Sequence, residues 1–224
     1  MVAFEVTKFS RSMRQYSFFD RVCLVADSAL KTTLGIYDAK PRPNPAQEID
    51  ESKMSDQDKT HAASLMRINH TGEVCAQALY QGQALTAKLP NIRDKMEQAA
   101  QEEIDHLAWC SERIHELGSR ESLLNPFWYA SSFTIGALAG IAGDKWSLGF
   151  VAETEHQVCR HLDDHLKKLP IQDSKSRVIL QQMREEELKH ATVAIEHGGA
   201  ELPKPIKGAM GLMSKVMTRT VYYI

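Results

Sequence analysis

Two copies of one short pattern, Glu-x-x-His, constrain this 224-residue chain more than any other feature. The first copy is Glu103-Ile-Asp-His106 and the second is Glu187-Leu-Lys-His190. Residues three apart on an α-helix lie on one face, so the carboxylate and the imidazole of each copy can reach the same point. A single copy arises often by chance in a charged helix. Two copies in matched positions predict helices that face a common site.

Four long segments have the apolar periodicity of amphipathic helices, at about 58–89, 91–117, 144–170 and 173–197. Pro90-Asn91 provides a short turn within the first pair, and Gly118 and Gly198-Gly199 are good helix stops. Almost nothing has the pattern of a strand. Because a long connection separates the two pairs, the sequence predicts an all-α four-helix bundle with a long crossover.

Each helical pair should also supply one inward glutamate from its first helix. Glu73 is the only acidic residue between Thr60 and Lys88, and small apolar residues share its face. On the third helix Glu155 lies in phase with the apolar stripe, whereas Glu153 lies off it. The chain therefore reads as two similar hairpins, each supplying a glutamate and then Glu-x-x-His.

This pattern supplies four carboxylates and two imidazoles, which is the ligand set of a carboxylate-bridged di-iron or di-manganese bundle. Four carboxylates balance two divalent cations, whereas buried and unpaired they would each be strongly destabilising. Hard oxygen ligands with imidazole suit iron or manganese better than copper or structural zinc. The predicted metal ligands are Glu73, Glu103, His106, Glu155, Glu187 and His190.

Further acidic residues flank both copies of the pattern. Glu102, Asp105, Glu185 and Glu186 are expected on a solvated face or in contact with the ligands. Asp105 and Glu186 in particular are placed to hydrogen-bond the histidines.

Composition excludes several classes of protein. With 27 Lys and Arg against 29 Asp and Glu, the net charge is −2, which does not suggest a nucleic-acid binder. The four cysteines form no CxxC pair and are expected to be buried reduced thiols in a cytoplasmic protein. No GxGxxG or P-loop motif is present for a nucleotide cofactor.

Two apolar segments suit a membrane surface. Residues 122–143 contain no charge but include Asn125, Pro126 and three glycines, which favours an interfacial or re-entrant segment over a simple span. Residues 207–224 combine apolar side chains with three cations and no acid, as an interfacial helix does. The alternative for both segments is that they simply cover the bundle core.

The amino-terminal residues 1–57 read as a helical extension and linker. Apolar residues recur at helical spacing between Phe18 and Leu30, and the run PRPNP at 41–45 ends that pattern. No signal peptide is visible. The predicted domains are therefore 1–57 and a bundle domain with its carboxy-terminal tail at 58–224.

Together these residues resemble the demethoxyubiquinone hydroxylase family, in its bacterial form, over roughly residues 58–224. The motifs that carry the resemblance are Asn69-His70-Thr71-Gly72-Glu73 with Ala76 and Tyr80, Glu103-Ile-Asp-His106-Leu107, Glu155 with His161, and Glu185-Glu186-Glu187-Leu-Lys-His190. The resemblance implies an all-α, ferritin-like four-helix bundle with a long crossover connection and additional membrane-interface helices. One departure is visible, because some members carry paired histidines where this chain has Arg160-His161 and His190-Ala191.

The resemblance also implies an activity. Members are peripheral membrane di-iron monooxygenases that insert one atom of O2 into a 2-polyprenyl-3-methyl-6-methoxy-1,4-benzoquinol in ubiquinone biosynthesis. It implies two iron ions per chain, held by the six residues above, with Glu103 and Glu187 as the bridges and manganese not excluded. The expected partners are the polyprenyl benzoquinol, O2 and the cytoplasmic face of the bacterial cell membrane, with no nucleic acid. A homo-oligomer or a ubiquinone-biosynthesis complex is left open.

Two rival functions share the same ligand set. A membrane quinol oxidase of the alternative-oxidase type would reduce O2 to water without modifying the ring. A ferritin-like iron-binding protein would store or oxidise iron. The uncharged connector and the cationic apolar tail favour the hydroxylase over the ferritin.

Overall fold

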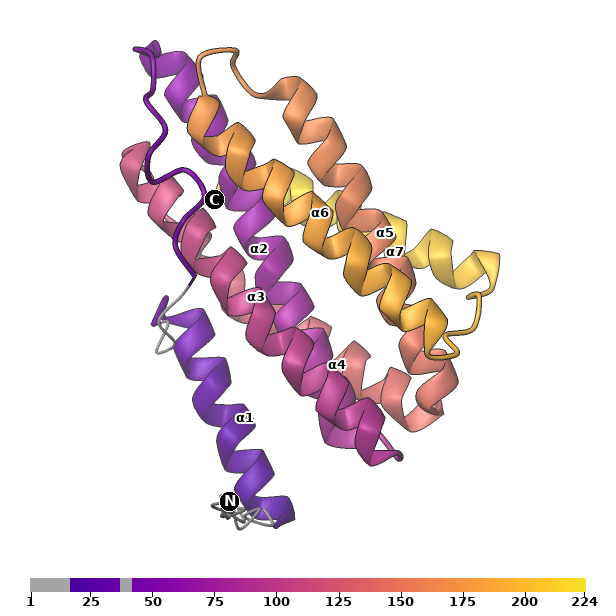
Figure 1. Ribbon diagram of the computed structural model, residues 1–224. Coiled ribbons are helices and arrows are strands. Elements are labelled where there is room, and N and C mark those ends of the chain that lie inside the picture. Colours follow the sequence, from indigo (N-terminus) through magenta and orange to yellow (C-terminus); the bar gives the residue numbers. More distant parts are fainter. Residues whose placement is uncertain (1–16, 37–41) are drawn as a thin grey trace, which may run out of the picture.

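Four long helices form the bundle in the computed structural model, which describes residues 17–36 and 42–224 (Figure 1). They are α2 (Asp56–Thr86), α3 (Pro90–Glu116), α5 (Asp144–Lys168) and α6 (Ser174–Glu196). α2 and α3 form one hairpin, α5 and α6 form the second, and the hairpins lie side by side. The described residues contain no strand, and the predicted all-α, ferritin-like bundle is confirmed.

The helix ends follow from local sequence. The Ser55 hydroxyl caps α2 by accepting a hydrogen bond from the backbone N–H of Asp58 at 3.1 Å. α3 ends just before Gly118 and α6 just before Gly198, and these glycines adopt φ angles of +73° and +92°. This left-handed conformation favours glycine, so both predicted stops are confirmed.

The crossover between the hairpins is a continuous helix, α4 (Asn125–Ala142), rather than a re-entrant turn. One face packs on α2 so closely that a Cβ added to Gly82 would lie 2.3 Å from the Phe133 carbonyl oxygen. A Cβ added to Gly136 would lie 2.2 Å from the Leu79 carbonyl oxygen. The glycines of this segment therefore permit backbone contact between two helices. Away from α2, exposed apolar side chains include Phe127, Leu138 and Ile141.

Two further helices flank the bundle. α7 (Lys204–Val221) contacts α2 and α5, and α1 (Phe18–Thr33) contacts α2 and α4. Both correspond to helical segments expected from the sequence. Among the described residues, none of the helices combines the length and the hydropathy needed to cross a membrane. The domain boundary at residue 57 stays a prediction.

Residues 42–55 run along α3 as a strap (Figure 1). The indole N–H of Trp109 donates to the carbonyl oxygen of Arg42 at 3.0 Å, and the Asn44 amide donates to Glu112 at 2.7 Å. The Arg113 guanidinium donates to Glu51 near the other end of the strap. This segment is therefore fixed to the bundle by side-chain contacts at both ends.

The cysteines are less uniform than expected. Cys110 and Cys159 are buried and Cys75 is half-buried, but Cys23 is exposed on α1. The prediction of buried thiols is therefore wrong for Cys23. All four are free thiols.

Two apolar clusters fill the interior at different levels of the bundle. One includes Leu65, Ile114 and Met183, and the other includes Ile92 and Leu148. The glutamates and histidines singled out by the sequence lie on the helix segments between these clusters. The site is therefore enclosed by apolar core above and below.

Candidate metal centre

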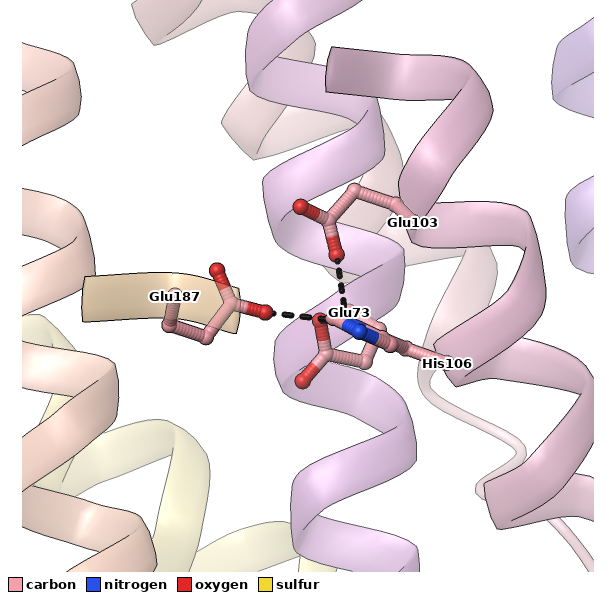
Figure 2. Close-up of side chains that lie close together, drawn as sticks. All are labelled: Glu73, Glu103, His106 and Glu187. Atoms are coloured by element: carbon pink, nitrogen blue, oxygen red, sulfur yellow. Dashed lines mark hydrogen bonds and ion pairs between the residues drawn. The ribbon is translucent and has the colours of Figure 1, made fainter. Parts of the chain in front are cut away.

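Three helices bring four of the predicted ligands into one tight group. Glu73 on α2, Glu103 and His106 on α3, and Glu187 on α6 each offer an atom within 4.8 Å of the others. Figure 2 shows these side chains pointing toward one another. All four are buried. Such a cluster of carboxylates and imidazole can hold a metal ion.

Three carboxylates surround one nitrogen of His106. Its Nδ1 lies 2.9 Å from Glu187 Oε1, 3.2 Å from Glu103 Oε2 and 3.7 Å from Glu73 Oε2. A protonated ring nitrogen can donate to only one of these oxygens at a time, and an unprotonated one can donate to none. A metal cation could instead contact this nitrogen and several of the three carboxylates at the same time.

His190 repeats this arrangement from the second hairpin. Its Nδ1 lies 3.2 Å from Glu187 Oε2 and 3.4 Å from Glu103 Oε1. Glu103 and Glu187 thus each present one oxygen to His106 and the other oxygen to His190. The structure brings these two carboxylates between the two histidines, and the bridging role that the family resemblance implies for them stays a prediction.

Helical phase correctly separated the two acids of α5. Glu155 is fully buried and accepts a hydrogen bond from the Tyr80 hydroxyl, and its carboxyl interacts with Glu187. Glu153 instead lies toward α7, where the Lys207 ammonium is 3.5 Å from its carboxylate. The inward direction of Glu155 is confirmed, and its role as a metal ligand stays a prediction.

The four inward carboxylates are not satisfied by the protein alone. Each of them has a buried oxygen that makes no hydrogen bond: Glu73 Oε2, Glu103 Oε1, Glu155 Oε2 and Glu187 Oε1. Three of these oxygens lie near a histidine Nδ1 that can donate to only one oxygen at a time. Each such atom costs about 1–3 kcal/mol when nothing compensates it. Two divalent cations would bind these oxygens and balance four negative charges, so the residues fit a two-metal centre.

The pKa values of these residues also indicate that the cluster needs positive charge. Burial raises the pKa of Glu73 and of Glu155 well above the ordinary value of a glutamate. For Glu103 and Glu187 the effect of burial is outweighed by the histidines, which lower the pKa of both carboxyls. Burial would lower the pKa of His190, but Glu103 and Glu187 outweigh it and raise that pKa to about 12. Without a metal, protons therefore supply the positive charge that the cluster needs.

The outer nitrogen of each histidine is held by a carboxylate of the opposite hairpin. His106 Nε2 lies 2.7 Å from Glu186 Oε2, and His190 Nε2 lies 2.7 Å from Glu102 Oε2. Both glutamates directly precede the glutamate of a Glu-x-x-His copy. Such contacts orient a metal-binding histidine and fix which of its nitrogens faces the metal.

Only part of this set of outer hydrogen-bond partners was predicted from the sequence. The predicted hydrogen bond between Glu186 and a histidine is confirmed, with the Glu186 carboxylate accepting. The one predicted for Asp105 is wrong, because its carboxylate instead accepts from Arg42. Glu102 was not singled out for this role, although a signal was present: both copies read Glu-Glu-x-x-His.

A narrow apolar cavity of about 120 Å³ reaches the site between α2, α4, α5 and α7. Glu73 has the one carboxyl group in its wall, whose other members are mostly apolar. Representative lining residues are Leu79, Trp128, Phe150, Leu162 and Met213. An apolar molecule in this cavity would lie beside the Glu73 edge of the cluster.

A wider polar cleft of about 680 Å³ opens between α3 and α6. Its lining includes Tyr80, Glu102, Glu186 and His190, together with Arg42 from the strap. The cluster is therefore approached by an apolar cavity at one edge and by a polar cleft at another.

A family model and individual relatives of this chain point to the same group of proteins. The family model described as ubiquinone biosynthesis protein COQ7 matches residues 60–221. A protein of Pseudomonas fluorescens is 59% identical over 213 residues, covering 95% of this chain and 99% of that protein. One of Azotobacter vinelandii is 61% identical over 211 residues, covering 94% of this chain and 98% of that protein. Both relatives are named 3-demethoxyubiquinol 3-hydroxylase.

Proposed function

This chain belongs to the ubiquinone biosynthesis protein COQ7 family, and from that premise we propose that it hydroxylates the ring of a 2-polyprenyl-3-methyl-6-methoxy-1,4-benzoquinol with O2. The observation that carries the proposal is the buried pair Glu103 and Glu187, which lie between the inner nitrogens of His106 and His190. The buried carboxyls of Glu73 and Glu155 lie beside them. The quinol supplies two electrons, so that one oxygen atom enters the ring and the other leaves as water.

Two iron ions are the proposed cofactors. Glu73, Glu103, His106, Glu155, Glu187 and His190 would hold them, with Glu103 and Glu187 shared between the two. Bound iron would supply the activation of O2. Manganese would accept the same ligands, so metal analysis of the purified protein decides between them.

The protein's own contribution is to position the substrate and exclude water. The apolar cavity beside Glu73 suits a quinol ring, with the polyprenyl tail leaving between α4 and α7. Asn69 and Gln157 are polar groups in this mostly apolar wall and can orient the ring oxygens. The core clusters on both sides of the ligands keep bulk water from the reacting edge.

The outer surface suits peripheral attachment to the cytoplasmic face of the bacterial cell membrane. Exposed apolar side chains lie on α4, where Phe127 is an example, and on α7, where Leu212 and Val216 are examples. α7 also carries Lys207 and Lys215, whose charge would favour anionic lipid. Residues of both helices line the cavity, so we propose that a quinol enters between them from the bilayer.

Oxygen labelling tests the proposed reaction. The full-length protein would be loaded anaerobically with ferrous iron and given the demethoxy quinol and ¹⁸O₂. We expect a quinone product that carries one labelled oxygen by mass spectrometry. An unlabelled quinone with labelled water would contradict the hydroxylase and support a quinol oxidase. Oxidation of iron within a large hollow assembly, seen by light scattering, would support the ferritin alternative.

A further inference from the structure

The two glutamates that hold the histidines from outside are themselves held very differently. Arg42 donates to both carboxylate oxygens of Glu186, from Nη1 at 2.7 Å and from Nη2 at 2.8 Å. Gln182 adds a third hydrogen bond at 2.7 Å. Glu102 receives one further hydrogen bond among the described residues, from Gln98 at 2.9 Å. A bidentate guanidinium fixes a carboxylate far more firmly than an amide on an exposed turn does.

Arg42 is fixed in turn by α3. Its backbone N–H donates to Asp105 Oδ1 at 3.0 Å and its Nε donates to Asp105 Oδ2. Its guanidinium lies 5.0 Å from the centre of the Trp109 ring, and the indole N–H bonds its carbonyl oxygen. Arg42 therefore links α3 to α6 through two carboxylates. An isolated surface ion pair contributes little, but this one is part of a network with several fixed partners.

Solvent access follows the same asymmetry. The His106 side chain is 0% exposed and its partner Glu186 is 13% exposed. The His190 side chain is 14% exposed and its partner Glu102 is 43% exposed. His190 lines the polar cleft between α3 and α6, so that a solvent path leads to this histidine.

We propose that Arg42 is a positioning residue that makes the two metal positions unequal. By holding Glu186 against His106, it makes the position beside His106 the tighter one. The position beside His190 exchanges its metal with solvent through the polar cleft. This inference rests on the two-metal centre proposed above, and it assigns a role to a residue of the strap that lies outside the matched segment 60–221.

Metal titration of the full-length protein tests this inference. Metal-free protein would be titrated with Co²⁺, a visible probe of ligand binding, in competition with a chelator, and then with ferrous iron without oxygen. We expect two classes of site in the wild type. Arg42→Ala should weaken the tighter class by roughly tenfold. This is the lower end of the effect of removing an outer partner of a metal-bound histidine, because Arg42 acts on His106 through Glu186. The weaker class should change by less than about threefold.

Two variants serve as controls. Lys95→Ala removes a cation from the same cleft, and among the described residues Lys95 is not an ion-pair partner of Glu186, so both classes should bind as in the wild type. Arg42→Lys keeps the charge but loses the bidentate geometry, and its affinity should be intermediate. Circular dichroism of each metal-free variant checks that the bundle still folds.

A double-variant comparison identifies the position that Arg42 acts on. In a His190→Ala background, Arg42→Ala should weaken the remaining site by the full factor. In a His106→Ala background it should have almost no effect.

The outcomes separate this inference from the proposed function. Unchanged affinities in Arg42→Ala, equal weakening of both classes, or two equal sites in the wild type would each overturn the role of Arg42 and leave the metal centre standing. A wild-type protein that binds no metal would overturn both.

Discussion

The two hairpins place almost the same residues around the centre but support them differently. His106 and His190 face the same two carboxylates, and each is held from outside by a glutamate of the other hairpin. The difference comes from residues that the repeat does not contain. Arg42 fixes the His106 side, and the His190 side borders a cleft. A repeated pattern can therefore build a symmetric set of ligands, while unrepeated residues decide how firmly each half is held.

The inward glutamates differ in a similar way. Two turns beyond Glu73, Tyr80 reaches across to donate to Glu155. Two turns beyond Glu155, the matching residue is Leu162, which lines the apolar cavity beside Glu73. The α5 glutamate thus has a fixed hydroxyl partner, whereas the α2 glutamate borders the space proposed for substrate. Tyr80 and Leu162 therefore make the two edges of the centre different. Glu155 marks the supported edge, which has a hydroxyl partner, and Glu73 marks the edge beside the cavity proposed for substrate.

The strongest test removes a residue that both halves share. Glu187→Ala should lower the metal content and the hydroxylation rate by more than about 100-fold, because Glu187 contacts both histidines. Elemental analysis and product formation measure the two effects. Glu185→Ala removes an exposed acid from the same helix and should leave both unchanged. Normal turnover in Glu187→Ala would show that the ligand assignment is wrong.

The next test sets the two outer glutamates against each other. Glu186→Gln should lower affinity at one metal position by roughly 10–100-fold, because it disturbs the link from Arg42 to His106. Glu102→Gln should cost less, since Glu102 is more exposed and less firmly held. Chelator competition measures both variants. If Glu102→Gln had the larger effect, the assignment of the tighter half would be reversed.

Acidity should weaken metal binding in both halves. The pKa of His190 is raised to about 12, and the pKa values of Glu73 and Glu155 are raised by burial, so the metal-free centre carries protons near neutral pH. Because a metal must displace these protons, apparent affinity should rise about tenfold per pH unit for every proton released. Titrations between pH 6 and pH 8 with a proton-release indicator would measure the slope. A flat profile would contradict the protonated resting cluster.

The smallest expected effect on metal affinity comes from a change at the supported edge, beside Glu155. Tyr80→Phe removes the hydroxyl that donates to Glu155 and should reduce metal affinity by about threefold to tenfold, the range of one ordinary hydrogen bond. Burial keeps the pKa of Tyr80 well above its usual value, so the hydroxyl stays a donor. Leu162→Met, at the matching position on α5, should leave metal affinity unchanged and alter only substrate affinity. Equal losses of metal in both variants would remove the distinction between the two edges.

The elements that could be predicted from the sequence are those governed by helical periodicity. The period of 3.6 residues places Glu73 and Glu155 on inward faces, and it distinguishes Glu155 from Glu153 without any knowledge of tertiary contacts. Glycines after α3 and α6 mark helix ends for a local reason. These inferences need only a few neighbouring residues in the chain.

The contacts that could not be predicted join segments without a shared period. Arg42 lies in a Pro-rich linker, and its partner Glu186 is on the last helix of the bundle. No local pattern pairs these two residues. The sequence also gives no sign that Asp105 accepts from Arg42, so the prediction that it would bond a histidine is wrong. The glycines of 122–143 favour an interfacial or re-entrant segment, but the segment is a continuous helix in which Gly136 allows α4 to contact the α2 backbone. A glycine can permit either a turn or a close approach of two helices. Only the packing of the neighbouring helix shows which of these applies.

The backbone contact between α2 and α4 has a mechanical consequence. Atoms at van der Waals distance across Gly82 and Gly136 leave no room for sliding, so the two helices must tilt and translate as one body. α4 presents exposed apolar side chains outward, and α2 carries Glu73 inward. If α4 rests on a lipid surface, as proposed, a tilt of α4 would therefore also move Glu73 at the edge of the candidate metal centre. The proposed membrane surface would then help to set the position of Glu73 relative to the other proposed ligands.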